Sequence, residues 1–338
     1  PSINENVRNV LTLAASDTDA GDSATFAITG GADSELFEID GGTTLRFAAA
    51  AGANYESPGD AGTNNEYVVV VTATDTGANA VAQTITITIQ DVNEFSPVFG
   101  DGDTATATPN ENQQAVGTYA ATDADGTATQ TYSILTAAQN AASVDHDLFS
   151  VGAGGVLAFS SAPDFETPGC GAGDNSNTCA VVIQVTDGAN TDTITVTVNV
   201  QDVNEFSPEF GDGSTATANV DENQQAVGTY AASDADGTAT QTYSILTATQ
   251  NAASVDHDLF SVASGGVLTF ATAPNYESAG CGSGDDSNTC VVVIQVTDGA
   301  NTDTITVTVN VQDVNEFSPE FGDGDTATAT PNENQQAV

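Results

Sequence analysis

The sequence of 338 residues has almost no positive charge. Only Arg8 and Arg46 are basic, whereas 47 residues are Asp or Glu, and the formal net charge is −45. This balance excludes nucleic acids and anionic membrane surfaces as partners, because phosphate binding requires Lys and Arg side chains. No apolar run approaches the roughly 18 residues of a membrane-spanning helix, so no direct membrane insertion is expected in this segment. A chain with this charge attracts cations instead.

Residues that support catalysis are also scarce. Met and Trp are absent, and the two histidines, His146 and His257, each lie in a Val-Asp-His-Asp-Leu-Phe segment at the entrance to an expected strand. No Ser-His-Asp or Cys-His set can be assembled, because each third of the chain has at most one His and no cationic neighbour to tune a nucleophile. We therefore expect no enzyme, and we expect both histidines to have turn or surface roles.

An acidic segment recurs with a fixed spacing. The pattern Asp-Val-Asn-Glu-Phe-Ser-Pro-Xaa-Phe occupies residues 91–99, 202–210 and 313–321, a spacing of 111 residues, and residues 111–120 return unchanged as 222–231. A repeat of this length is long enough for an independent domain. Because the sequence begins and ends inside a repeat, we interpret it as an excerpt of a longer protein. The predicted domains are residues 1–95, 96–206 and 207–317, followed by the truncated start of a fourth repeat at 318–338.

Apolar and polar residues alternate along each repeat. Within residues 193–200, Ile194, Val196, Val198 and Val200 share one face and Thr side chains share the other, which is typical of a half-buried strand. The predicted fold class is all-β, with tandem immunoglobulin-like, seven-stranded antiparallel β-sandwiches arranged end to end. The strands expected in the second repeat lie near 105–107 and at 116–122, 130–135, 148–151, 156–159, 180–185 and 193–200.

The four cysteines form two local pairs, Cys170 with Cys179 and Cys281 with Cys290. A zinc site needs four Cys or His ligands together, and no His lies near either pair. We therefore predict two hairpin disulfides, which indicate an oxidising environment outside the cell or at its surface. The first repeat has residues 57–66 at this place and no cysteine, so the disulfide is an accessory to the fold.

The acidic residues concentrate where strands end. In sandwiches joined end to end, the lower pole of one repeat, the linker and the upper pole of the next would bring these groups together. At about 6 Å each pair of carboxylates costs roughly 0.7 to 3 kcal/mol, and the sum over such a cluster exceeds the stability of a domain. Many oxygen ligands without Cys or His select a hard cation, Ca²⁺ in particular. The predicted cluster at the second joint is Glu111, Asp164, Glu166, Asn204, Glu205, Asp234, Asp236 and Asp298.

A solvated acidic surface is the alternative interpretation for any single acid. It is assigned to residues that lie outside the clusters, namely Asp33, Asp60, Asp174, Asp285 and Asp286. The Asp that opens each linker is expected to be structural and not a ligand; these residues are Asp91, Asp202 and Asp313.

The acidic motifs, in this order and in every repeat, resemble the calcium-binding motifs of tandem cadherin repeats. One such motif alone would be weak evidence, but five in order, repeated along the chain, are specific. The resemblance implies Ca²⁺ ligands at the early glutamates Glu5, Glu111 and Glu222, at the Asx-x-Glu pairs Asn54/Glu56, Asp164/Glu166 and Asn275/Glu277, and at the linker pairs Asn93/Glu94, Asn204/Glu205 and Asn315/Glu316. The resemblance implies further Ca²⁺ ligands of three kinds. They are the carbonyl groups of Val92, Phe95, Val203 and Phe206, the Asp-x-Asp pairs Asp17/Asp19, Asp123/Asp125 and Asp234/Asp236, and the late acids Asp75, Asp187 and Asp298.

The sequence departs from the cadherin pattern in several respects. Phe stands in the linker where cadherins have a second Asn, of which only the carbonyl group is used, and the segment after Asp125 is short. Glu stands in the linker where cadherins have Asp. Asn54 and Asn275 replace Asp, which removes one charge at the first and third joints. The absence of Trp rules out the Trp exchange of vertebrate classical cadherins, so the chain looks like a prokaryotic cadherin-like surface array. The resemblance implies about three Ca²⁺ at each complete joint.

Two classes of function remain open. One is a calcium-dependent structural or adhesive repeat region of an extracellular surface protein or filament, whose partners are calcium ions, neighbouring repeats and like chains. The alternative is a polysaccharide-binding or other ligand-binding module of a secreted bacterial protein. Such a site usually presents exposed aromatic rings, and aromatic residues make up only 6% of this chain. Near-identical consecutive repeats favour the structural class.

Overall fold

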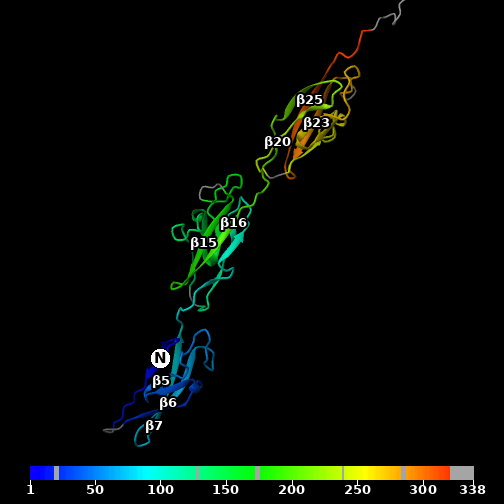
Figure 1. Ribbon diagram of the computed structural model, residues 1–338. Helices are drawn as coiled ribbons and strands as arrows, with labels where there is room; N and C mark the ends of the chain where they lie inside the picture. The colour runs from blue at the N-terminus through cyan, green and yellow to red at the C-terminus, as the bar shows by residue number, and fades with distance from the viewer. Residues whose placement is uncertain (19–22, 127–128, 172–175, 238–239, 283–286, 320–338) are drawn as a thin grey trace, which may run out of the picture. The chain divides into compact units, whose positions relative to one another are not determined.

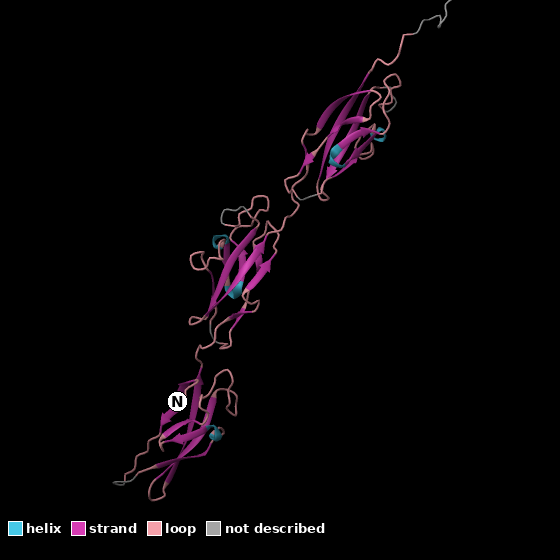
Figure 2. Ribbon diagram, viewed as in Figure 1, coloured by secondary structure: helices cyan, strands magenta, loops and turns pink. Residues whose placement is uncertain are grey.

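The computed structural model describes residues 1–18, 23–126, 129–171, 176–237, 240–282 and 287–319. Strands dominate the described residues, and the helices are 3₁₀ turns of three residues (Figure 2). The chain divides into two compact units, residues 1–201 and 202–338. None of the helices in these ranges is long and apolar enough to cross a membrane.

The first repeat folds into two sheets with a shared core. One sheet has the strand order β1-β7-β6-β3 and the other has the order β2-β5-β4. Leu45, Phe47, Val69 and Ile87 are buried in one contiguous cluster that draws on both sheets. Its elements are β1 (Ser2–Asn4), β2 (Asn9–Thr12), β3 (Thr25–Gly30), η1 (Ser34–Leu36), β4 (Phe37–Asp40), β5 (Thr44–Phe47), β6 (Glu66–Thr74) and β7 (Ala80–Gln90) (Figure 1).

The second repeat has the same two sheets and an additional short pair of strands. The sheet orders are β12-β15-β16-β9 and β10-β14-β13, and β8 pairs with β11. Its elements are β8 (Val98–Phe99), β9 (Thr104–Ala107), β10 (Ala115–Thr118), β11 (Ala121–Thr122), β12 (Thr131–Ile134), η2 (His146–Leu148), β13 (Phe149–Val151), η3 (Ala153–Gly155), β14 (Val156–Phe159), β15 (Thr178–Thr186) and β16 (Thr191–Asn199). Every strand expected from the sequence is present, and the one expected at 116–122 is split into β10 and β11.

The third repeat reproduces the second. Its sheet orders are β18-β25-β24-β21, β19-β23-β22 and β17-β20, and its core forms a separate cluster. The domain boundaries drawn from the sequence stay predictions. The elements are β17 (Glu209–Phe210), β18 (Thr215–Asp221), β19 (Ala226–Thr229), β20 (Ala232–Ser233), β21 (Thr242–Ile245), η4 (His257–Leu259), β22 (Phe260–Ala263), η5 (Ser264–Gly266), β23 (Val267–Phe270), β24 (Thr289–Thr297) and β25 (Thr302–Gln312).

The predicted β-sandwich is confirmed, but it is not wholly antiparallel. In each repeat a strand near the start pairs with the last strand in the parallel direction: β1 with β7, β9 with β16 and β18 with β25. The other pairs are antiparallel. An even number of reversals in chain direction between these two strands leaves them pointing the same way, so they can share an edge only as a parallel pair.

The histidines open the 3₁₀ turns η2 and η4, which confirms their expected role. The Nδ1 atom of His146 lies 3.0 Å from the carbonyl oxygen of Ser143, and His257 has the same contact with Ser254. These rings therefore fix a local turn ahead of β13 and β22.

Two acids that were expected at the solvated surface are buried. Asp33 is 4% exposed and Asp60 is 3% exposed. The two carboxylate oxygens of Asp33 accept the N–H groups of Ala61 and Val68, both at 2.7 Å. The surface assignment is wrong for both residues, because backbone donors compensate the cost of burying each carboxylate. Asp174, Asp285 and Asp286 lie outside the described residues.

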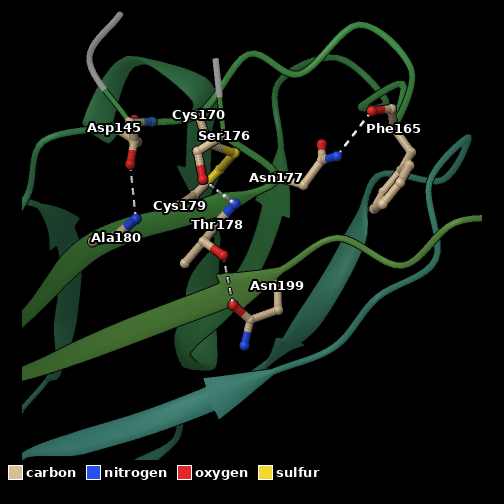
Figure 3. Close-up of a disulfide and its surroundings, with 10 residues drawn as sticks. Asp145, Phe165, Cys170, Ser176, Asn177, Thr178, Cys179, Ala180 and Asn199 are labelled. Atoms are coloured by element: carbon tan, nitrogen blue, oxygen red, sulfur yellow. Dashed lines mark hydrogen bonds between the residues drawn. A yellow bond between two sulfur atoms is a disulfide. The ribbon is translucent and has the colours of Figure 1, made fainter. Parts of the chain in front are cut away.

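Both predicted disulfides are present, and a buried Asp supports each of them. Cys170 bonds to Cys179, and Cys281 bonds to Cys290. Asp145 accepts the N–H of Gly171 at 2.7 Å and the N–H of Ala180 at 2.8 Å, so one carboxylate clamps the chain just after both cysteines of the first bridge (Figure 3).

In the first repeat a hydrogen-bonded loop replaces the disulfide. Asp33 takes the place of the clamping Asp, and Asp60 takes the place of the first cysteine. The oxygens of Asp60 accept the N–H groups of Asn64 and Asn65 at 3.0 and 3.1 Å, which closes the loop without a covalent bond. The Tyr67 hydroxyl accepts the N–H of Gly59 at 3.0 Å. These contacts explain how the fold forms without this bridge.

Candidate metal centres

Three carboxylates from separate parts of the first repeat meet at the end of β7. Glu5 follows β1, Glu56 lies in the loop between β5 and β6, and Asp91 directly follows β7. One oxygen atom of each lies within 4.8 Å of the other two. Three negative charges this close repel one another, so the arrangement suits residues that share a cation.

Main-chain N–H groups hold Glu5 in place. Its side chain is almost fully buried, at 2% exposure. Oε2 accepts the N–H of Tyr55 at 2.8 Å, and Oε1 accepts the N–H of Val92 at 2.9 Å. One buried carboxylate therefore ties the loop that carries Glu56 to the start of the linker.

Glu56 differs from Glu5 in its hydrogen bonding. Both of its carboxylate oxygens are buried, and neither has a hydrogen-bond partner among the described residues. Burial raises the pKa of Glu56, and the negative charges of Glu5 and Asp91 raise it further. A buried carboxylate without donors is costly, and a cation at this point would remove the cost.

A second group of acids lies at the near end of the second repeat. Asp123 and Asp125 follow β11, Asp187 lies in the turn between β15 and β16, and one oxygen of each lies within 4.8 Å of the others. Asp125 is 4% exposed, and its Oδ2 accepts the N–H of Phe95 at 3.0 Å. Its Oδ1 is buried without a hydrogen-bond partner in the described part of the chain. The N–H of Asn190 lowers the pKa of Asp187, so that carboxylate stays ionised.

The carboxylates of both groups affect the pKa of Asp91. Burial raises the pKa of Asp91, and the negative charges of Asp125, Glu5 and Asp123 raise it further. The sequence predicts a structural role for this residue. Its carboxylate lies beside Glu5 and Glu56, so Asp91 is also a candidate ligand.

Linker residues 93–95 are hydrogen-bonded to the second repeat. The side-chain amide of Asn93 donates to the carbonyl oxygen of Asp187 at 3.3 Å, and the amide of Asn190 donates to the carbonyl oxygen of Phe95 at 2.8 Å. Asn190 is not among the residues predicted from the sequence. Its place at the end of the Asp-Gly-Ala-Asn turn, which recurs with Asn301, was the available signal.

Glu94 reaches back toward the first repeat. Its side chain is exposed, and Oε2 accepts the side-chain N–H of Asn6 at 2.7 Å. Glu is one methylene longer than the Asp of the cadherin pattern. That extra length lets a linker carboxylate contact the residue next to Glu5.

Three more of the predicted acids, Glu111, Asp164 and Glu166, lie in the second repeat, which belongs to the first unit. Glu111 is 2% exposed, and its Oε2 accepts the N–H of Phe165 at 2.7 Å, as Glu5 does with Tyr55. Asp164 is exposed and Glu166 is half-buried in the same loop. The predicted joint between these acids and residues 203–206 stays a prediction.

Near the far end of β7, Asp17 and Asp75 line one hollow of about 410 Å³. The two oxygens of Asp75 accept the backbone and side-chain N–H groups of Asn79, both at 2.7 Å. Asp19, the third acid expected here, lies outside the described residues.

The second unit repeats the linker arrangement. The N–H of Phe206 donates to Asp236 Oδ2 at 3.1 Å, and the side-chain amide of Asn301 donates to the carbonyl oxygen of Phe206 at 2.7 Å. Burial raises the pKa of Asp234, and the charges of Asp236 and Asp298 contribute. The same unit contains the predicted linker residues Val203, Asn204 and Glu205.

A further group in the second unit consists of Glu222, Glu277 and Glu316, with one oxygen of each within 4.8 Å of the others. Glu222 is 1% exposed and accepts the N–H groups of Tyr276 and Val314 at 2.7 and 2.9 Å. These donors lower the pKa of Glu222, whereas burial and the charges of Glu222 and Glu277 raise that of Glu316. Asn315 lies exposed in the adjoining segment.

Comparison with known proteins identifies the fold of the chain. No protein-family model and no curated protein matches the sequence. The human desmocollin-1 ectodomain is 22% identical with a TM-score of 0.53; the similarity covers 93% of this chain and 60% of that one. Mouse cadherin-23 repeats EC22–24 are 19% identical with a TM-score of 0.51 and coverages of 93% and 95%. Protocadherin gammaB7 EC3–6 is 19% identical with a TM-score of 0.56 and coverages of 93% and 72%. The chain has the fold of tandem cadherin repeats.

Within these cadherin-like repeats, the replacement of Asp by Asn preserves local geometry. Asn54 Oδ1 accepts the N–H of Ser57 at 2.6 Å, and Asp164 Oδ1 accepts the N–H of Thr167 at 2.8 Å. The two residues therefore make the same turn and differ in charge alone.

The donor set of the centre at Glu5 and its neighbours suits Ca²⁺. All candidate ligands are oxygen atoms, most of them carboxylate, and several carboxylate oxygens are buried without an N–H donor among the described residues. A flexible set of many oxygens accommodates the larger Ca²⁺ better than Mg²⁺, which demands near-ideal octahedral geometry.

Proposed function

We propose that this chain is a calcium-dependent repeat region of an extracellular surface protein or filament, in which Ca²⁺ at the joints fixes the orientation of successive repeats. The observation that carries the proposal lies on the two sides of the first linker. There Glu56 and Asp125 present buried oxygens without hydrogen-bond partners in the described ranges. A region with this role is not an enzyme.

The first joint would take its ligands from three segments that otherwise move separately. Bound Ca²⁺ supplies the positive charge that neutralises their mutual repulsion. The first repeat contributes Glu5 and Glu56, and the second contributes Asp123, Asp125 and Asp187. The linker contributes Asp91, Asn93, Glu94 and the carbonyl groups of Val92 and Phe95. Because the ligands come from two repeats and the linker between them, a shared ion restricts the relative motion of these segments.

The chain's own contacts prepare this site. Glu5 positions the Glu56 loop and the linker through two N–H bonds, while Asp125 positions the linker through the N–H of Phe95. Without the ion, carboxylate repulsion favours separation of the repeats. The disulfides support an extracellular location, since they persist in oxidising compartments.

Small-angle scattering and calorimetry test the proposal. In calcium we expect a maximum dimension that fits extended, ordered joints, and in chelator a broader ensemble. Titration should show about six Ca²⁺ at the two complete joints. Asp236→Ala should loosen the second joint alone. Asp258→Ala is the matched control, because that side chain is 91% exposed. Identical scattering in calcium and chelator, or two or fewer bound ions, would contradict the proposal.

A further inference from the structure

A hollow lies beside the disulfide in both the second and the third repeat. Its volume is about 360 Å³ in the second repeat and about 320 Å³ in the third. The apolar walls in the second repeat are Leu148, Phe159, Cys170 and Val200, and the corresponding residues of the third repeat are Leu259, Phe270, Cys281 and Val311. Figure 3 shows the disulfide together with Asn177, which lines the same hollow. These volumes are at the lower end of the range for ligand pockets in proteins.

In the first repeat a tyrosine side chain occupies the corresponding place. Tyr67 on β6 stands at the position of Cys179 on β15, because the residue after each donates its N–H to the clamping Asp. Tyr67 is 2% exposed, and its ring packs edge-on against the ring of Phe47 with the centroids 5.2 Å apart. Its hydroxyl accepts the N–H of Gly59 at 3.0 Å. The first repeat therefore holds both the ring and the hydroxyl of this tyrosine.

The groups that hold Tyr67 have counterparts at the hollow. Phe159 ends β14 as Phe47 ends β5. Gly169 directly precedes the first cysteine of the bridge, and Gly59 directly precedes the residue that takes the place of that cysteine. Both Phe159 and Gly169 line the hollow. The hollow therefore lies where the first repeat places its phenol ring.

The space in front of Gly169 is open. A Cβ atom on Gly59 would lie 3.8 Å from the hydroxyl oxygen of Tyr67, whereas a Cβ atom on Gly169 or Gly280 would have no atom within 4 Å. The N–H of Gly59 donates to the tyrosine, but the N–H groups of Gly169 and Gly280 have no hydrogen-bond partner among the described residues. The disulfide thus replaces only part of the tyrosine side chain, and it leaves a hydrogen-bond donor at the edge of the hollow.

The rim of the hollow is acidic. Asp147 lines it in the second repeat with a side chain that is 92% exposed, and Asp258 lines it in the third with a side chain that is 91% exposed. The whole chain has a net charge of −45. An apolar hollow with such a rim favours an occupant that combines an aromatic ring with positive charge.

We propose that the second and third repeats each bind a tyrosine side chain presented by a positively charged segment of a partner protein. In the second repeat the ring contacts Phe159 and the hydroxyl accepts the N–H of Gly169, as Tyr67 does with its own neighbours in the first repeat. The first repeat fills this place itself and does not bind. A second copy of this chain is a poor partner, because both copies carry the same large negative charge. The site needs no calcium, so it is independent of the proposed function.

An NMR titration of the 338-residue chain with short peptides tests the proposal. The peptides have tyrosine, phenylalanine or alanine between two lysines, and the alanine peptide measures the binding of the positive charges alone. Near-physiological salt screens exposed charges over a Debye length of about 8 Å. We expect the tyrosine peptide to bind with a dissociation constant on the order of 1 mM, at two sites per chain, and the alanine peptide to bind at least tenfold more weakly.

The spectra also locate the ring and its hydroxyl. Ring protons of the tyrosine peptide should give NOEs to the methyl groups of Leu148 and Val200, and to the corresponding residues of the third repeat. The amide signals of Gly169 and Gly280 should shift with the tyrosine peptide more than with the phenylalanine peptide. Loss of one hydrogen bond should weaken the phenylalanine peptide by roughly 2- to 10-fold.

Gly169→Leu closes the site in the second repeat. The new side chain has room, since its Cβ atom meets nothing within 4 Å and Gly169 does not have a positive φ. Binding should fall at least tenfold in the second repeat and stay unchanged in the third, which shows in the same sample that the chain is folded. Gly152→Leu is the matched control, because Gly152 is exposed, has a φ of −97° and lies outside the hollow lining.

Three results would overturn the proposal. They are equal binding of the tyrosine and alanine peptides, ring NOEs to residues outside the hollow, and binding in the second repeat that Gly169→Leu leaves unchanged. A phenylalanine peptide that binds as tightly as the tyrosine peptide would overturn the choice of tyrosine. N-acetyltyrosinamide that binds as tightly as the tyrosine peptide would overturn the protein partner in favour of a free phenol.

Discussion

Replacing Glu56 by Gln should have opposite effects with and without calcium. Glu56 has one oxygen within 4.8 Å of oxygens of Glu5 and Asp91, and both of its oxygens are buried without a hydrogen-bond partner among the described residues. The substitution keeps the shape of the side chain and removes its charge. In the ion-free protein it removes repulsion, and in the calcium-loaded protein it removes a ligand.

The size of the ion-free effect follows from the geometry. At 4.8 Å two unit charges repel by about 0.9 kcal/mol in water-like surroundings and by about 3.5 kcal/mol at an effective dielectric of 20. We use the lower figure as a minimum, because the oxygen atoms lie at most 4.8 Å apart. Two neighbours then give about 2 kcal/mol, which corresponds to a rise in melting temperature on the order of 8 to 16 °C for a domain of this size.

In calcium the sign reverses. The loss of one carboxylate ligand should weaken Ca²⁺ binding at the first joint by at least about tenfold, or about 1.4 kcal/mol. Calorimetric melting in chelator and in calcium measures both effects, and Glu35→Gln, an exposed glutamate of the same repeat, is the control. A variant that melts lower than the native chain in both conditions would refute the reasoning, because Glu56 would then be a structural group and not a strained ligand.

Four further outcomes are expected. Asp164→Asn should weaken calcium binding at the second joint and Asn54→Asp should strengthen it at the first, as measured by calorimetry, because the two residues make the same turn and differ in charge. Reduction of the disulfides should destabilise the second and third repeats by roughly 2 to 3 kcal/mol each and leave the melting of the first unchanged. Asp33→Asn should destabilise the first repeat by about 1 to 3 kcal/mol in denaturant titration, because the amide cannot accept both backbone N–H groups. In chelator, stability should fall as pH rises from about 4 toward neutral: burial and neighbouring charges raise the pKa of Asp91, so the folded chain binds more protons than the unfolded chain in that window.

The sequence by itself determined the local features of this protein. Alternation such as Ile194, Val196 and Val198 identifies a strand, because side chains on a strand point to opposite faces in turn. The fixed spacing of the acidic linkers revealed the repeats. The short separation of each cysteine pair was enough to predict both disulfides. These signals depend on residues that are close in the chain.

The tertiary structure decided what depends on distant segments. Asp33 is an ordinary loop acid in sequence, and only the approach of the backbone N–H groups of Ala61 and Val68, 28 and 35 positions later, makes it a buried support. Asp91 becomes part of a carboxylate cluster because Glu5, 86 positions earlier, is brought to the end of β7 by the parallel pairing of β1. Burial and electrostatic strain depend on which segments pack together, and a single sequence does not state that packing.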